Sequence, residues 1–181
     1  MAFPAWLLDP DSTCKIICAS YGDQLSRDFS NRFRDLLWSN AHQALFPGSV
    51  IAPSGSSLPE VRVTSKGYWL ATTVQGPATG KGAHFIVVDD PLKAIEAARN
   101  ATHEWIKGSL MTRFDNPALG AMLVVMQRLR QDDLIGRLRD EGRWECLAMP
   151  GEFSERTVYD LGDGESSTVN PGDGRTSQSG W

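Results

Sequence analysis

The sequence predicts an α/β fold in which a mainly parallel β-sheet is covered by helices on both faces, giving three layers. Continuous apolar runs typical of buried strands alternate with segments whose apolar residues recur at helical spacing. With 181 residues, 41% of them hydrophobic, the chain is long enough for one domain of ordinary size. We place this domain at residues 1–150 and a flexible polar tail at residues 151–181.

The first half of the chain is expected to contain a strand, a helix and a hairpin. Residues 15–20 form a short apolar run that a Tyr-Gly turn stops, which is typical of a buried strand. Residues 23–38 carry Leu and Phe at helical spacing and predict an amphipathic helix. After a loop rich in Pro, Gly and Ser at 46–59, residues 60–74 alternate around a Ser-Lys-Gly turn. This alternation predicts a β-hairpin, which we interpret as an insertion.

The second half is expected to contain three more strands and two helices. Apolar runs predict strands at residues 85–88, 120–126 and 144–149. Pro91 suits the first turn of a helix after the first of these runs. Residues 131–141 predict a short helix between the other two.

Residues 151–181 differ from the rest of the chain in composition and charge. They contain two Lys or Arg against six Asp or Glu, so this segment carries the whole formal net charge of −4. They are rich in Gly, Ser and Thr and poor in large apolar side chains, which predicts a flexible tail. Basic and acidic residues balance over residues 1–150, which argues against a strongly basic nucleic-acid-binding module.

The three cysteines, Cys14, Cys18 and Cys146, are odd in number and include no CxxC pair. This usage argues against a disulfide framework or a structural zinc site and favours a reducing compartment. The first residues lack the basic start and long apolar run of a signal peptide, and no apolar run approaches the length of a membrane span. We therefore expect a cytoplasmic protein without membrane contact.

The sharpest functional signal follows the strand at residues 85–88, where Asp89, Asp90 and Pro91 come next. An apolar strand ending in adjacent acids is the Walker B pattern of P-loop NTPases. The first acid of that pattern holds Mg²⁺, because hard cations prefer oxygen ligands, and the second orients the attacking water. The same acids could instead cap the helix at Pro91 and favour its dipole. The pattern by itself leaves both interpretations open.

Further motifs follow one another in an order that resembles a known family. They are Phe3-Pro4-Ala5-Trp6, Ala19-Ser20-Tyr21-Gly22, Ala44-Leu45-Phe46-Pro47-Gly48, Thr79-Gly80-Lys81-Gly82, Glu104-Trp105, Met126-Gln127-Arg128-Leu129 and Asp132-Asp133-Leu134. Together with the Walker B pattern, this series resembles the ATPase domain of phage terminase large subunits over residues 3–150. The resemblance implies a P-loop NTPase fold, with ATP and Mg²⁺ as cofactors.

The resemblance also implies roles for four residues. Asp89 matches the Mg²⁺-binding acid and Asp90 the acid that activates water, although many such ATPases have the longer Glu at the second position. Gln127 follows the next strand, where these ATPases keep a polar residue that senses the γ-phosphate. A capping or loop amide is the other interpretation of Gln127. Lys81 lies in a loop that could face the nucleotide of a neighbouring subunit, or it is an ordinary solvated lysine.

By this resemblance, the function is ATP-driven packaging of viral DNA into a prohead in the cytoplasm of a bacterial host. The family works as a ring of identical subunits. The partners that it implies are double-stranded DNA, the terminase small subunit and the portal.

The sequence contains no GxxxxGK[ST] motif, the loop that binds phosphate in this family. The family carries that loop before a segment like residues 3–6, and an RNase H-like nuclease domain after the ATPase domain. We expect both to be missing here, through truncation of the gene or because another chain supplies them. The phosphate-loop strand would lie between the strands at 120–126 and 144–149, so we expect an incomplete sheet and an inactive isolated chain.

Two alternative functions stay open. One is a non-catalytic prophage remnant or interaction module. The other is a metal-dependent nuclease that uses Asp89 and Asp90. Adjacent strand residues point to opposite faces, so the nuclease interpretation requires the strand to have ended at these acids.

Overall fold

The computed structural model describes residues 2–54, 56–76, 78, 80–91, 100–128 and 130–172. The chain divides into two compact units, Met1–Arg143 and Trp144–Trp181. The helix predicted to begin at Pro91 lies largely outside the described residues. After these residues, the described chain resumes with α4 (Asn100–Trp105), which continues as a π-helical turn at Ile106–Leu110.

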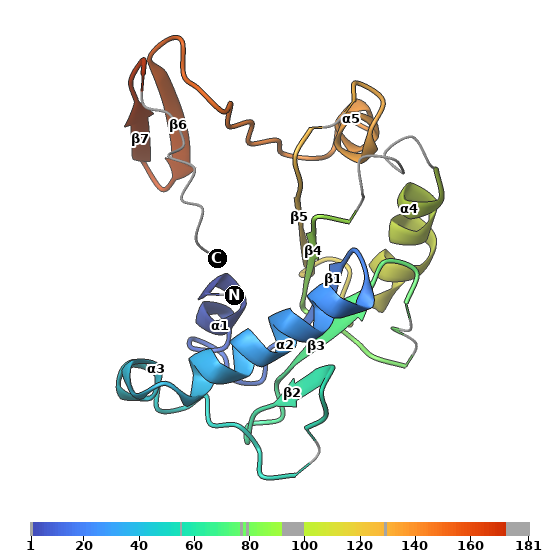
Figure 1. Cartoon of the computed structure of the whole chain (residues 1–181), viewed down its shortest axis with the longest axis vertical. Coiled ribbons are helices and arrows are strands. Elements are labelled where there is room, and N and C mark those ends of the chain that lie inside the picture. Colours follow the sequence, from blue (N-terminus) through green and yellow to red (C-terminus); the bar gives the residue numbers. More distant parts are fainter. Residues whose placement is uncertain are drawn as a thin grey trace. The chain divides into compact units, whose positions relative to one another are not determined.

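The first unit is built on a five-stranded sheet with the strand order β2-β3-β1-β4-β5 (Figure 1). The parallel strands are β3 (Tyr68–Thr73), β1 (Lys15–Ser20), β4 (Phe85–Asp89) and β5 (Ala121–Val125), and β2 (Glu60–Arg62) pairs antiparallel with β3. The predicted α/β fold with a mainly parallel sheet is confirmed. The strands predicted at 15–20, 85–88 and 120–126 each end within one residue of the observed bounds.

The predicted hairpin forms, but it is part of the sheet and not an insertion. β2 and β3 pair through Val61 and Trp69, while β3 also pairs in parallel with β1 over its whole length. Gly67, before β3, closely approaches the backbone at Ser12 and Cys14. A Cβ at this glycine would lie 2.3 and 2.7 Å from their carbonyl oxygens, so only glycine fits there.

One face of the sheet packs under α2 (Asp23–Trp38), the helix predicted at these residues. Phe33 stacks on Trp69 with ring centroids 4.8 Å apart, and both side chains are fully buried. On the opposite face, Ile17 of β1 and Ile86 of β4 are fully buried as well. These strands are therefore buried on both faces, as a parallel sheet between helices requires.

Three shorter helices complete the described part of the first unit: α1 (Ala2–Leu7), α3 (Asn40–Leu45) and α5 (Leu134–Asp140). The helix predicted at residues 131–141 is confirmed as α5, which buries Leu134 and Leu138. Among the described residues, no helix has the length and apolar character needed to cross a membrane.

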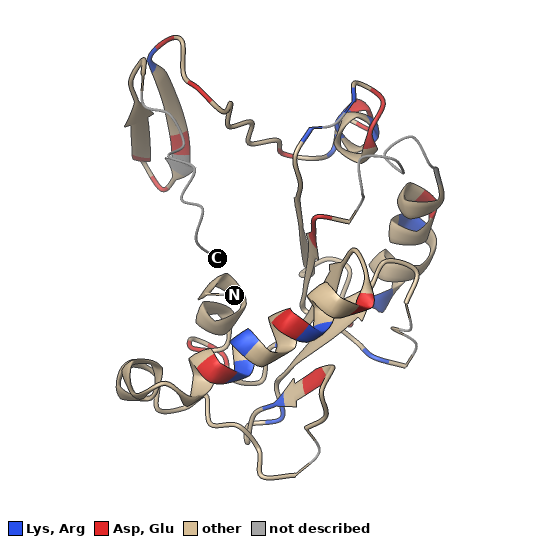
Figure 2. Ribbon diagram, in the orientation of Figure 1, with Lys and Arg blue, Asp and Glu red and all other residues tan. Residues whose placement is uncertain are grey.

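The sheet ends at β5, whose outer side has no strand partner in the described part of the chain. Leu123 and Val125 are 44% and 46% exposed. β5 carries no charged residue (Figure 2), although charges are a usual protection of an edge strand. β5 is therefore an apolar edge strand in the described structure, and the incompleteness of the sheet stays a prediction.

The prediction of a strand at residues 144–149 is wrong. Residues 144–150 form no strand, and Leu147 and Met149 are 66% and 47% exposed. An apolar run becomes a strand only where a neighbouring strand can pair with it. No described strand lies alongside this segment.

The second unit contains a hairpin in the segment where a polar tail was predicted. β6 (Thr157–Gly162) pairs antiparallel with β7 (Glu165–Val169). Asp163 and Gly164 connect the two strands, both with positive φ, at 54° and 82°. This is the Asp-Gly signal of a tight hairpin. The prediction of a flexible tail rested on the composition of the segment and did not use this signal. The compact unit spans Trp144–Trp181, and the domain boundary at residue 150 stays a prediction. A loose attachment of this segment stays a prediction, and residues 173–181 lie outside the described residues.

Candidate active site at the carboxyl edge of the sheet

The parallel register brings the ends of three strands together at one edge of the sheet. Ser20 at the end of β1 lies beside Asp89 at the end of β4, and Asp89 lies beside Val125 at the end of β5. On the other side of β1, Ser20 lies beside Thr73. The carboxyl ends of parallel strands are the usual place for ligand binding in open α/β sheets. Asp89 is central on this edge.

Asp89 is half-buried, and its carboxylate accepts no hydrogen bond from the residues that the structure describes. Burial raises the pKa of Asp89, and the neighbouring Asp90 raises it further. The charge of Asp89 in turn affects a buried thiol of the core, that of Cys18. Burial raises the pKa of the Cys18 thiol to about 12, and the charge of Asp89 contributes to that shift. Cys18 therefore stays protonated, and Asp89 is a carboxylate without a partner among the described residues.

Asp90 follows the last residue of β4 and leaves the strand geometry. Its φ is +45°, and its N–H donates to the Val125 carbonyl at 2.8 Å. Left-handed backbone is uncommon outside glycine, and Asp and Asn tolerate it better than most residues. In a continuing strand, Asp90 would point to the face of the sheet opposite Asp89. Because Asp90 leaves the strand geometry, its exposed side chain is not held to that face. The helix-capping interpretation falls on residues 92–99, outside the described part of the chain.

The end of the strand at Asp89 also meets the condition that the nuclease interpretation set. A metal-dependent nuclease, however, needs several ligands close together. The described residues contain no group of three or more His, Cys, Asp or Glu side chains that could hold a metal ion.

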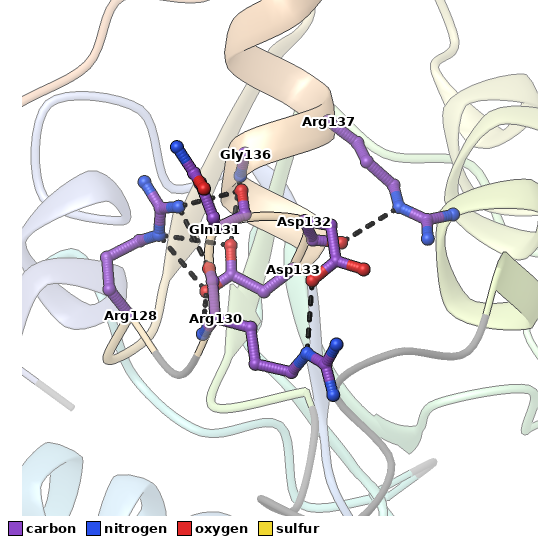
Figure 3. A network of polar contacts seen from close by, with 7 residues as sticks. All are labelled: Arg128, Arg130, Gln131, Asp132, Asp133, Gly136 and Arg137. Atoms are coloured by element: carbon purple, nitrogen blue, oxygen red, sulfur yellow. Dashed lines mark hydrogen bonds and ion pairs between the residues drawn. The ribbon is translucent and has the colours of Figure 1, made fainter.

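Gln127 lies two residues beyond the end of β5, on the same edge as Asp89, and is exposed. The segment after it is fixed by a polar network (Figure 3). Arg128 pairs with Asp133 at 3.0 Å and donates to two backbone carbonyls, those of Arg130 and Gln131. Asp133 is fully buried and caps α5 by accepting from Gly136 N–H at 3.0 Å. The network therefore anchors the chain directly after Gln127.

Lys81 is not brought to this edge. It precedes β4, and its ammonium lies 2.8 Å from Glu60 and 5.4 Å from the centre of the Tyr68 ring. Tyr68 begins β3, so this cluster belongs to the amino end of the parallel strands. The carboxylate of Glu60 is mostly buried and pairs with both Lys81 and Arg62, the latter at 2.7 Å. A role for Lys81 at a neighbouring subunit's nucleotide stays a prediction, and it would require this ion pair to open.

Sequence reasoning missed Ser20 as a site residue. Its side chain is only 1% exposed, and its hydroxyl has no hydrogen-bond partner in the described part of the chain. The available signal was its position: it ends the strand that precedes a Tyr-Gly turn, among residues that are otherwise apolar.

An apolar cavity of about 720 Å³ at the amino edge of the sheet was also missed by sequence reasoning. It is bordered by Phe3, Trp6, Phe85 and Leu119. One polar group on its wall is Asp115, which pairs with Lys15 at 2.7 Å. This cavity is far along the strands from Asp89.

No protein-family model matches the sequence, and no curated protein matches it significantly.

Proposed function

We propose that this chain is part of the ATPase domain of a phage terminase large subunit, the motor that drives viral DNA into a prohead. The observation that carries the proposal is the strand order. Asp89 and Asp90 end β4, Gln127 follows β5 beside it, and β5 is the outermost strand. In the fold that the motif order implies, the phosphate-loop strand pairs with the strand that precedes the γ-phosphate sensor. That position is the open side of β5.

The exposed side chains of β5 support this proposal. Leu123 lies beside Val87 in the register, and Val125 lies beside Asp89. Val87 belongs to the core under α2, so Leu123 and Val125 face the same side of the sheet but have no described helix over them. A strand pairing with β5, followed by a helix on this face, would bury them. Burial of apolar surface contributes about 25 cal/mol per Å², which would favour such an addition.

The residues at the carboxyl edge fit a bound Mg²⁺. Asp89 offers a carboxylate that nothing else in the described structure occupies. When bound, Mg²⁺ would neutralise negative charge on the phosphates of ATP. Asp90 would orient the attacking water, and Gln127 would respond to the γ-phosphate. Arg128 and Asp133 would hold Gln127 in place. None of these residues binds the triphosphate, and two carboxylates repel it, so the chain by itself should bind ATP weakly.

The remaining features of the proposal come from the family resemblance. The complete motor would be a ring of identical subunits acting on double-stranded DNA in the bacterial cytoplasm, together with the small subunit and the portal. Lys81 would approach the nucleotide of a neighbouring subunit.

The test is an ATPase assay with a nucleotide-binding titration on four proteins: the chain alone, the chain extended by an upstream phosphate-loop segment, and the Asp89→Asn and Asp90→Asn variants of the extended chain. The chain alone should hydrolyse ATP negligibly. The extension should restore binding and turnover. Asp90→Asn should abolish turnover and keep binding, since Asn tolerates the left-handed backbone at this position. Asp89→Asn should also weaken Mg²⁺-dependent binding.

Robust hydrolysis by the chain alone would show that the phosphate site is already complete, against the proposal. Turnover that is indifferent to Asp90→Asn would remove the Walker B assignment and leave these acids as helix caps.

A further inference from the structure

Two buried serines of the first unit differ in how their hydroxyl groups are satisfied. Ser30 in α2 is fully buried, and its hydroxyl donates to the carbonyl of Leu58. Ser20 at the end of β1 is 1% exposed, and its hydroxyl has no partner among the described residues. Burying a hydroxyl without a hydrogen bond is unfavourable, and such groups are rare in native proteins. Packing alone does not account for a serine at position 20.

The sheet places the Ser20 hydroxyl on the same face as the Asp89 carboxylate. Residues in register on neighbouring parallel strands point to the same side of the sheet. The two pairs before them confirm the face: Ile16 lies beside Phe85 and Cys18 beside Val87, all against the core under α2. The effect of the Asp89 charge on the Cys18 pKa agrees with this placement. Two neighbouring side chains with oxygen atoms at the carboxyl edge therefore both lack partners among the described residues.

We propose that Ser20 and Asp89 form one binding site for a hydrated divalent cation. Asp89 supplies the negative charge, directly or through a water. The Ser20 oxygen accepts a hydrogen bond from a cation-bound water and so positions the hydration shell. Magnesium-like cations suit this arrangement, because they take oxygen ligands and keep several of their waters.

The inference deepens the proposed function, on which the biological identity of the cation as Mg²⁺ rests. The site itself consists only of residues described here and needs no nucleotide. Its test can therefore be made on the chain as it exists, without ATP.

The experiment measures Mn²⁺ binding by electron paramagnetic resonance and thermal unfolding with and without Mg²⁺. It compares the wild-type chain with Ser20→Ala, Ser30→Ala and Asp89→Asn. Ser20→Ala should leave the metal-free Tm unchanged or raise it, because the substitution removes an unsatisfied buried hydroxyl. It should weaken Mn²⁺ binding about 10-fold, as loss of a group that supports a metal ligand does. Asp89→Asn should abolish binding.

Ser30→Ala is the matched control for the loss of a buried hydroxyl. It should lower the Tm by about 2–4 °C with or without metal and leave Mn²⁺ affinity unchanged. A Ser20→Ala variant that loses Tm like Ser30→Ala and binds Mn²⁺ like wild type would overturn the inference. Absence of Mn²⁺ binding to the wild-type chain at millimolar concentrations would overturn it too. If Ser20 contributes to Mn²⁺ binding but the extended chain hydrolyses no ATP, the cation site stands and the terminase proposal fails.

Discussion

The two halves of the sheet differ in how fully the described chain buries their side chains. On β1 and β3, side chains are buried on both faces, and the aromatic rings of Phe33 and Trp69 stack under α2. On β5, Leu123 and Val125 are nearly half exposed, and Asp89 at the end of the neighbouring β4 has no partner among the described residues. Packing within the chain explains the first half except for Ser20, the last residue of β1, whose hydroxyl also lacks a described partner. In the second half, the residues that packing leaves unexplained are the ones that the proposed ATPase would use.

Truncating one apolar side chain in each half gives the largest contrast. Phe33→Ala should lower the free energy of unfolding by about 3–5 kcal/mol, because it removes a fully buried ring and leaves a cavity. Leu123→Ala should cost less than about 1 kcal/mol, because that side chain is already largely in water. Urea unfolding measures both. Equal losses would mean that β5 is covered in solution by something that the described structure does not contain.

The ion pair of Lys81 gives an intermediate effect in the more fully buried half. Lys81→Met should lower stability by up to about 1 kcal/mol, because it removes one of two cations that pair with the mostly buried Glu60 carboxylate, while Arg62 remains 2.7 Å from it. Lys66→Met, at an exposed lysine in the nearby turn, is the control and should change little. Urea unfolding at neutral pH compares them. If Lys81→Met is silent, the ion pair is dispensable and Lys81 is free to act between subunits.

The open side of β5 should govern self-association more than stability. Leu123→Lys places a charge on the apolar edge and should shift a concentrated sample from aggregates towards monomer, since charged residues block edge-to-edge pairing. Leu45→Lys, at a 71% exposed position on α3, is the matched control and should leave association as in wild type. Size-exclusion chromatography with light scattering reports the difference. A wild-type chain that stays monomeric and cooperatively folded at high concentration would argue against an unfinished edge.

The smallest expected effect is a gain in stability at Asp89. Burial and the charge of Asp90 raise the pKa of this carboxyl above 3.8, so its ionised form is less favourable in the fold than in the unfolded chain. The unfavourable contribution of Asp89 to wild-type stability should therefore disappear as the pH falls from neutral through the folded-state pKa towards 3.8.

Asp89→Asn should be more stable than wild type at neutral pH by less than about 1 kcal/mol, because solvent screens a half-exposed group, and the difference should vanish near pH 3.8. Urea unfolding of both proteins at a series of pH values measures this. A variant less stable than wild type at neutral pH would show that the carboxylate has a stabilising partner.

The sequence predicted the strands and helices whose patterns are complete within the chain. The apolar runs that became β1, β4 and β5 and the amphipathic pattern of α2 were read correctly because local periodicity matches what the sheet buries. The run at residues 144–149 has the same local pattern, but no described strand pairs with it. The Asp163-Gly164 turn shows the reverse case, in which a short backbone signal produced a hairpin in a polar segment.

The sequence revealed site residues only where they are adjacent in the chain. Asp89 and Asp90 were found because they follow one another after an apolar strand. Ser20 lies far from them in the sequence and meets Asp89 only through the parallel pairing of β1 and β4. Lys81 was placed by its loop motif, but its position depends on Glu60 and Tyr68, whose approach the local sequence does not encode.

Hydrogen–deuterium exchange of the β5 backbone tests most directly the claim that this strand is where the ATPase fold is completed. In the chain alone, the N–H groups of Ala121–Val125 that point away from β4 should exchange rapidly, since no described strand pairs with that side. In the chain extended by a phosphate-loop segment, the same amides should become protected together with the added strand. Amides that stay fast in an extended, folded protein would contradict the account, because the added segment would then pair elsewhere.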